Sequence, residues 1–293
     1  MKILSIEFVD NWSWGLVFNN LKLSNIERIF INMGDQVNTN DKDIVLSQNI
    51  TLLKKFKERA NVVCRMGGNY NFDTLKGLDK LLAEMSKCYC LIATNQKLYN
   101  IAKAIHSEVY LLPNGLDLDK WKKVNKTNNT FTVGFCGNIT NEWYREYKGF
   151  DLVEEACDNL GIKLQTALYR DKQIPHDKMQ EMFYSKIDCI VHPTKGEGCS
   201  NVLMEACACG VPIITTKEAG FHGELFEHEK NVMFCERTVR SIQDQIYKLK
   251  MNPYLLNKLS ENGRLFAEEY HDVKKIAKTY NDIFNECYRR MHG

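Results

Sequence analysis

Short apolar runs alternate with segments of helical periodicity along almost the whole chain of 293 residues. This alternation predicts parallel α/β structure, because parallel neighbouring strands need a crossover connection and a helix usually supplies it. Strands are predicted at residues 2–8, 28–32, 44–47, 61–66, 90–94, 108–112, 131–136, 163–168, 188–192, 211–215 and 231–234. Such strands build doubly wound sheets, which hold ligands at the carboxyl ends of their strands.

The length predicts two domains, because a single core rarely keeps growing to 293 residues. A turn at Pro113-Asn114-Gly115 and a polar, Lys/Asn-rich stretch at 120–130 indicate the boundary. We therefore predict an N-terminal Rossmann-like domain at 1–120 and a C-terminal Rossmann-like domain at 121–270. A last helix at 271–293 is expected to pack back toward the N-terminal domain. Helices in the second half are predicted at 149–159, 176–185, 200–209 and 239–249.

Composition narrows the class of protein. Thirty-nine basic and 37 acidic residues leave a formal charge of +2, too small to indicate nucleic-acid or membrane binding through the overall field. Eleven cysteines, an odd number set in apolar runs and helical patterns, favour free thiols in a reducing compartment, so we expect a cytoplasmic protein without a transmembrane segment. The C-x-C pairs Cys88/Cys90 and Cys207/Cys209 lack the spacing of a zinc site, and no metal site is expected.

The most informative segment of the second half reads DCIVHPTKGEGCSNVLMEACACGVPIIT. It predicts a strand, a glycine-bearing loop, a helix capped by Ser200 or Asn201 and closed by Gly210, and a second strand. Such a loop brings a helix N-terminus to the edge of the sheet, where backbone amides and the helix dipole favour a phosphate. Glu197 and Glu205 can accept hydrogen bonds from sugar or ribose hydroxyls, although the bare pattern also fits a helix with two solvated acids.

This segment resembles the donor-binding signature of family 4 glycosyltransferases, a retaining family with the two-domain GT-B fold. The resemblance rests on the E-x7-E spacing, the small-residue helix EACACG and the following VPIITT, and with further matches it covers nearly all of residues 108–290. It implies transfer of a hexose or pentose from a nucleotide diphosphate sugar, a UDP- or GDP-sugar, with retention and without a metal or cofactor. In the family the first glutamate contacts donor-sugar hydroxyls and the second the ribose, roles that fall on Glu197 and Glu205.

Upstream matches imply a diphosphate site. VGFCG, which ends at Gly137, looks like the first strand and glycine turn of the family's second domain, and KGFD, which starts at Lys148, looks like its diphosphate-binding lysine and the following glycine. The family's second cation, an arginine, is replaced here by Asn138, and the insert at 141–147 follows. Arg145 in the insert can restore the charge, because a guanidinium can clamp a phosphate with two hydrogen bonds; the insert can equally serve the acceptor. The catalytic candidates are Glu197, Lys148 and Arg145. The predicted donor site comprises Gly137, Asn138, Lys148, Glu197, Gly198, Cys199, Ser200, Asn201 and Glu205.

The N-terminal half resembles the family more weakly. Arg65 lies where the family often has an arginine or threonine, and Gly67 stands in place of a histidine that contacts the donor sugar. Trp12, Trp14 and Gly15 replace the glycine-rich loop after the first strand, as buried aromatic residues or as a platform on which an acceptor stacks. These five residues are the acceptor-side candidates. The N-terminal domain is shorter than is usual in the family, which implies an unusual acceptor or an unusual way of holding it. The acceptor itself stays open between a glycan, a lipid, a small molecule and a modified DNA base.

Two alternatives stay open at this point. One is a phage-type DNA-base glycosyltransferase, a special case of the same chemistry. The other is an inactive GT-B module that binds nucleotide or glycan, which is compatible with the missing histidine and arginine. The stretch AGFHGE, which contains His222, resembles the family's loop of backbone amides near the donor phosphates, and His222 is either a loop residue or a catalytic base.

Overall fold

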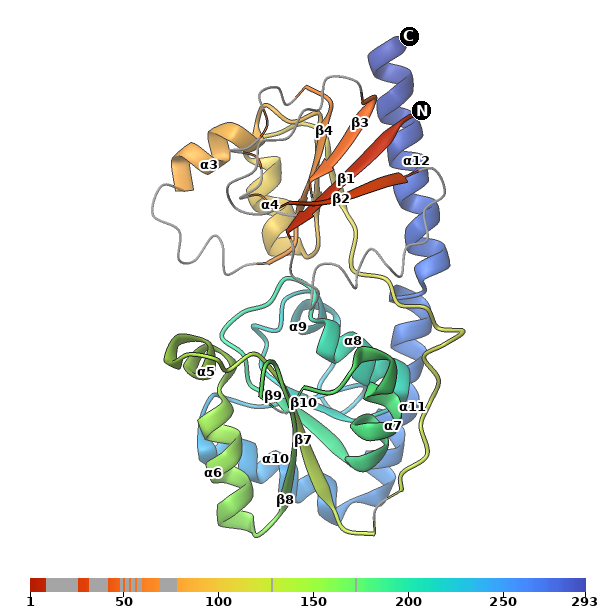
Figure 1. Cartoon of the computed structure of the whole chain (residues 1–293). Coiled ribbons are helices and arrows are strands. Elements are labelled where there is room, and N and C mark those ends of the chain that lie inside the picture. The colour runs from red at the N-terminus through yellow and green to blue at the C-terminus, as the bar shows by residue number, and fades with distance from the viewer. Residues whose placement is uncertain are drawn as a thin grey trace. The chain divides into compact units, whose positions relative to one another are not determined.

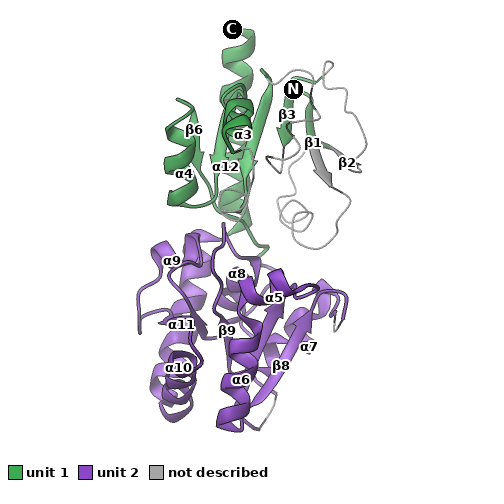
Figure 2. Cartoon of the chain, turned by 90° about the vertical axis from the view of Figure 1, so that its left-hand side faces the viewer, with its two compact units in different colours: residues 1–117, 272–293 green, residues 118–271 purple. Residues whose placement is uncertain are grey.

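The computed structural model describes residues 1–8, 26–31, 42–47, 50, 53, 56, 60–68, 78–127, 129–171 and 173–293. They form two compact units, residues 1–117 with 272–293 (unit 1) and residues 118–271 (unit 2), coloured separately in Figure 2. The chain leaves unit 1 after Asp117, three residues before the predicted boundary at 120, and returns at Asp272. There it runs beside its own exit, because Val273 donates its backbone N–H to the Leu116 carbonyl at 3.1 Å.

Unit 1 is built on one parallel sheet, in the strand order β2-β1-β3-β4-β5-β6 (Figure 1). Its strands are β1 (Ile3–Phe8), β2 (Ile26–Ile31), β3 (Ile44–Ser47), β4 (Val62–Met66), β5 (Cys90–Ala93) and β6 (Val109–Leu111). Its described helices are α3 (Leu78–Met85), α4 (Gln96–Lys103) and α12 (Val273–His292).

The central strands of unit 1 are apolar on both faces, as a sheet covered on both sides requires. In β3, Val45 belongs to the cluster that contains α3 and α4, whereas Ile44 and Leu46 belong to the cluster that contains α12. The C-terminal helix α12 therefore packs in the apolar cluster on one face of the sheet of unit 1.

Unit 2 is built on a second parallel sheet, in the order β11-β10-β9-β7-β8. Its strands are β7 (Thr132–Gly137), β8 (Lys163–Leu168), β9 (Cys189–His192), β10 (Ile213–Thr215) and β11 (Met233–Phe234). Its α-helices are α5 (Glu142–Lys148), α6 (Phe150–Leu160), α7 (Met179–Met182), α8 (Asn201–Cys209), α9 (Phe221–Leu225), α10 (Val239–Met251) and α11 (Pro253–Tyr270). Figure 1 shows α6 and α10 on one face of this sheet and α7, α8 and α11 on the other.

The two doubly wound parallel sheets confirm the predicted fold class. All eleven predicted strands are present to within about two residues at each end. The helix predicted at 176–185 is wrong as a continuous element, because the chain there breaks into the 3₁₀ turn His176–Lys178, α7, and the 3₁₀ turn Tyr184–Lys186. The break follows from tertiary contacts described below, which turn the side chains at both ends of the segment toward α8.

Candidate functional site

The strand order of unit 2 reverses beside β7. Strand β8 lies on one side of β7 and strand β9 on the other, so the connection from β8 to β9 crosses back over the sheet. In doubly wound sheets such a switch point opens a crevice at the carboxyl ends of the two strands, and ligands bind there. β7 ends at Gly137 and β9 ends at His192, so the switch point is bordered by the segments that follow these two residues.

The side chains of Lys148, His192 and Glu197 meet at this edge. Lys148, the last residue of α5, forms an ion pair with Glu197 in the loop after β9. The same carboxylate oxygen, Oε1, lies 2.9 Å from Nε2 of His192. The side chains of Lys148 and Glu197 keep 19% and 17% of their surfaces exposed, whereas His192 is buried.

The electrostatics of this group favour an ionised acid and a neutral imidazole. Burial alone would raise the pKa of Glu197, but the charge of Lys148 and the hydrogen bonds from His192 and Lys148 outweigh burial and lower the pKa to about 2. Burial lowers the pKa of His192, and Glu197 offsets this only in part. A neutral His192 can donate only one ring N–H, and Nε2–H to Glu197 is the donor that the contact requires. Glu197 is thus held as an anion whose lone pairs accept hydroxyl donors.

Backbone contacts fix the loop that carries Glu197. Its N–H donates to the Glu218 carbonyl at 3.1 Å, and Phe221 donates to the Gly198 carbonyl at 2.8 Å. Gly220 has φ +62°, and a Cβ there would lie 2.2 Å from the Glu197 carbonyl oxygen, so only glycine permits this approach. The stretch AGFHGE therefore supports the glutamate loop, and from Phe221 onward it belongs to the short helix α9.

Arg237, which sequence reasoning missed, holds Lys148 in place. Its guanidinium donates to the backbone carbonyls of Tyr147, Glu146 and Pro193, and so ties the end of α5 to the loop after β9. A Cβ on Gly149 would meet the Pro193 carbonyl oxygen at 2.8 Å, which shows how closely the two segments approach. Nothing around Arg237 in the sequence marks it, because it lies after β11, about 90 residues from its partners on α5.

Glu205, in the middle of α8, is buried and hydrogen-bonded. Tyr184 donates its hydroxyl to Oε2 at 2.9 Å, and Nε2 of His176 lies 3.0 Å from Oε1. Burial lowers the pKa of His176, but its hydrogen bond to Glu205 and the charge of Glu205 outweigh burial, so the net shift is upward. These contacts turn both ends of segment 176–185 toward α8 and explain why it is not one helix. Neither partner of Glu205 was predicted.

The cap of α8 follows the prediction, with Ser200 as the N-cap and Gly210 at φ +66° as the C-cap. Leu203 donates its N–H to the Ser200 hydroxyl at 3.5 Å. The N-terminal turn of α8, which contains Asn201, therefore starts three residues after Gly198 and directly after the glutamate loop. Cys199, directly before Ser200, is buried.

Asn138 and Arg145 each interact with other side chains of the protein in this structure. Asn138 accepts hydrogen bonds from the N–H and the hydroxyl of Thr140, so it shapes the turn after β7. The insert is a helix, α5, and Arg145 on it pairs with Asp151 and with Glu154, whose contact is 3.1 Å long. Its guanidinium also lies over the Phe150 ring.

The acceptor-side candidates lie in unit 1. Arg65 on β4 is buried and donates to the Asn114 side chain, so it links β4 to the segment after β6. Gly67 follows β4 directly. Trp12, Trp14 and Gly15 lie outside the described residues.

A protein-family model described as glycosyl transferases group 1 matches residues 118–266, half of the chain. The match coincides with unit 2, which carries Lys148, Glu197 and Glu205. The chain belongs to the group 1 glycosyl transferases.

Curated relatives of this group 1 transferase cover parts of it. A capsular polysaccharide biosynthesis glycosyltransferase of Staphylococcus aureus, CapM, is 23% identical over 67% of this chain and 56% of its own length. An N-acetyl-alpha-D-glucosaminyl L-malate synthase of Bacillus anthracis is 28% identical over 48% of this chain and 35% of its own. The chain thus spans about half of CapM and about a third of the synthase.

Solved structures match the group 1 transferase over nearly its full length. HepE of Anabaena in complex with UDP has a TM-score of 0.77 at 13% identity, covering 98% of this chain and 100% of that one. Sucrose-phosphate synthase of Thermosynechococcus elongatus has a TM-score of 0.71 at 14% identity, covering 99% of each chain. These likenesses establish the GT-B fold with its two parallel-sheet domains. HepE has also been solved with UDP-glucose.

None of the eleven cysteines forms a disulfide and all are buried, which confirms the expectation of thiols rather than disulfides. Among the described residues, no helix combines the length and apolar character needed to cross a membrane.

Proposed function

We propose that this protein is a glycosyltransferase that moves a sugar from a UDP-sugar to an acceptor, with the donor bound at the switch point of unit 2. The observation that carries the proposal is the meeting of Lys148 and ionised Glu197 at the carboxyl edge of β7 and β9, next to the N-terminus of α8. A uridine donor is favoured because HepE, which has the same fold, was solved with UDP and with UDP-glucose.

Each charged residue then has a chemical role. Lys148 exchanges its partner Glu197 for the diphosphate and offsets the negative charge that grows on the leaving group. Glu197, released from the lysine and still bonded to His192, accepts hydrogen bonds from the donor-sugar hydroxyls. Backbone amides at the start of α8 face the phosphates. Glu205 receives the ribose hydroxyls in competition with its partners His176 and Tyr184.

Arg145 has a weaker claim in this scheme. Its pairs with Asp151 and Glu154 compete with any phosphate contact. We propose that the insert helix α5 acts mainly by presenting Lys148 at its C-terminal end. Arg145 remains the candidate for the vacant arginine role at Asn138.

Retention of configuration and the acceptor-side roles of Arg65, Gly67 and the two tryptophans belong to the proposal through the family resemblance. For the acceptor we favour a glycan or a small hydroxylated molecule, since the relatives include a capsular polysaccharide transferase and a malate glycoside synthase. We also propose a cytoplasmic location, because a reducing compartment keeps cysteines out of disulfides and none of the eleven forms one.

The decisive experiment is calorimetric titration of the full chain with UDP, GDP, ADP and TDP, followed by incubation with the matching nucleotide sugars. We expect UDP to bind most tightly and a UDP-sugar to be slowly hydrolysed even without an acceptor. Lys148→Ala should slow that hydrolysis. Nucleotide binding without any hydrolysis or transfer would favour the inactive binding module, and absence of any nucleotide binding would refute the proposal.

A further inference from the structure

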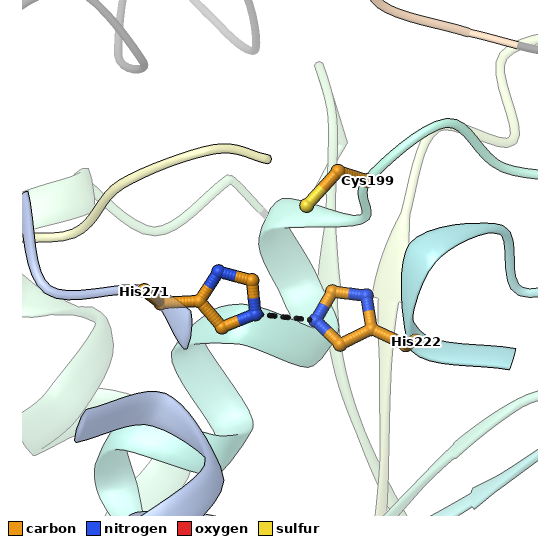
Figure 3. Close-up of side chains that lie close together, drawn as sticks. All are labelled: Cys199, His222 and His271. Carbon is orange, nitrogen blue, oxygen red and sulfur yellow. Dashed lines mark hydrogen bonds between the residues drawn. The ribbon is translucent and has the colours of Figure 1, made fainter. Parts of the chain in front are cut away.

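Three buried side chains of unit 2 lie close together beside the loop that carries Glu197. Cys199 comes from that loop, His222 from α9, and His271 from the end of α11. Their ligand atoms all lie within 4.8 Å of one another. Figure 3 shows the Cys199 sulfur directed toward the gap between the two imidazole rings. The exposed fraction is 6% for Cys199 and 0% for both histidines.

The two imidazoles face each other through like atoms. Nε2 of His222 and Nε2 of His271 are 3.1 Å apart. In neutral imidazoles one of these nitrogens carries a proton and the other a lone pair, whereas a metal ion could take a lone pair from both.

The spacing suits three positions of a tetrahedral ion, two filled by nitrogen and one by sulfur, with water as the fourth ligand. Zn–N bonds of about 2.0–2.1 Å and a Zn–S bond of about 2.3 Å place the ligand atoms about 3.3 to 3.6 Å apart in a tetrahedron. The observed N···N separation of 3.1 Å is close to this value. Because all the ligand atoms lie within 4.8 Å of one another, side-chain shifts of about 1.2 Å or less would bring each pair to the tetrahedral value.

We propose that Cys199, His222 and His271 bind one Zn²⁺ ion through Sγ and the two Nε2 atoms. On binding, the Cys199 thiol loses its proton to solvent, and the imidazole that carried the proton on Nε2 shifts it to Nδ1, so one proton is released per ion. Zinc fits because it accepts mixed imidazole and thiolate ligands. The three ligands are 23 and 49 residues apart in the sequence, which no local metal motif spans.

The site would be structural. It would join the glutamate loop, α9 and the last residue of unit 2, so its ion would brace the loop that presents Glu197 without touching the donor. His222 is then a ligand on a supporting element, and its complete burial argues against the role of catalytic base.

The test measures metal content and spectra of the full chain rather than its activity. Protein purified without chelator, and chelator-treated protein titrated with Zn²⁺, should each hold one zinc per chain. Zinc should raise the Tm. Co²⁺ in its place should give the absorption bands of tetrahedral, thiolate-ligated cobalt. Cys199→Ala and His271→Asn should each weaken Zn²⁺ binding by roughly 100-fold or more, because even the residues that support metal ligands cost 10- to 100-fold when changed.

Two variants serve as matched controls. Cys235→Ala removes another buried thiol of unit 2, and His228→Asn removes an imidazole outside the cluster; both should keep one zinc per chain. Circular dichroism identifies any variant that fails to fold, and the two ligand variants are independent of each other. Zinc content well below one per chain in the wild type, or equal zinc affinity in the folded ligand and control variants, would overturn the proposal. Failure of the nucleotide experiments would leave this proposal unaffected.

Discussion

Replacing Lys148 by alanine removes the cation that pairs with Glu197 in this structure and that we propose faces the donor diphosphate. The fold should tolerate the change, because Lys148 is the last residue of α5 and is partly exposed. The neighbouring backbone keeps its anchor, since Arg237 binds the carbonyls of Glu146 and Tyr147 and not the lysine side chain.

The cost should divide unequally between binding and chemistry. In the ground state Lys148 exchanges one anionic partner, Glu197, for another, so the net contribution to donor binding is small. As the glycosidic bond breaks, negative charge grows on the diphosphate, whereas the charge on Glu197 stays the same. Lys148 therefore stabilises the transition state more than the ground state. We expect kcat to fall by about 100-fold, equivalent to about 2.7 kcal/mol, and donor affinity to fall by less than about tenfold.

The measurement combines steady-state kinetics with calorimetric UDP titration. Lys195→Ala is the matched control, because Lys195 is another cation of the same region and pairs with Glu146 on α5, so both kcat and affinity should stay near wild type. Lys148→Arg, which keeps the charge, should recover part of kcat. If Lys148→Ala retains wild-type kcat, the placement of the donor at this edge is wrong.

Arg145→Ala decides the role of the insert. Because Arg145 pairs with Asp151 and Glu154, we expect a much smaller loss of kcat than for Lys148→Ala. An equal loss, with a double mutant no worse than either single mutant, would instead show that Arg145 and Lys148 act on one diphosphate.

Four further predictions concern the same site. Glu205→Gln should weaken UDP binding by about 1 to 3 kcal/mol in a folded protein, because a charged acceptor becomes neutral; unchanged calorimetric affinity would remove Glu205 from the site. Transfer should need no added Mg²⁺ or Mn²⁺, and an absolute requirement for either ion would contradict the proposed chemistry. The pKa of Glu197 falls from its ordinary value of 4.5 to about 2 in the folded protein, so ionised Glu197 stabilises the fold by on the order of 3 kcal/mol above pH 4.5, and this stabilisation is lost as the pH drops toward 2. Chemical unfolding between pH 4.5 and pH 2 should therefore show a smaller loss of stability in Glu197→Gln than in wild type. Arg237→Met should lower the free energy of unfolding by about 1 to 3 kcal/mol and also reduce kcat, since it leaves carbonyls without their donor and loosens Lys148; wild-type urea unfolding and kinetics would show that the clamp is dispensable.

Much of the fold could be predicted because its determinants are local. The strands are short apolar runs. Those at the centre of each sheet are apolar on both faces, so they can be recognised without knowing which face a helix covers. The caps of α8 were predictable for the same reason: Ser200 and Gly210 act on the backbone of their own helix. Segment 176–185 could not be predicted, because its contacts with Glu205 override its helical periodicity.

The sequence by itself determined two parallel α/β units, a helix N-terminus at a sheet edge, and the chemical types available there, a lysine and two glutamates. Only the tertiary structure decided which of these groups meet. Glu197 gains its low pKa from Lys148, 49 residues away, and Arg237 reaches carbonyls on α5 about 90 residues away. The Cys199, His222 and His271 cluster likewise exists only after the loop, α9 and the end of α11 have packed. Periodicity reports local backbone preference, whereas long-range pairing depends on the register and order of the strands that bring distant loops to one edge.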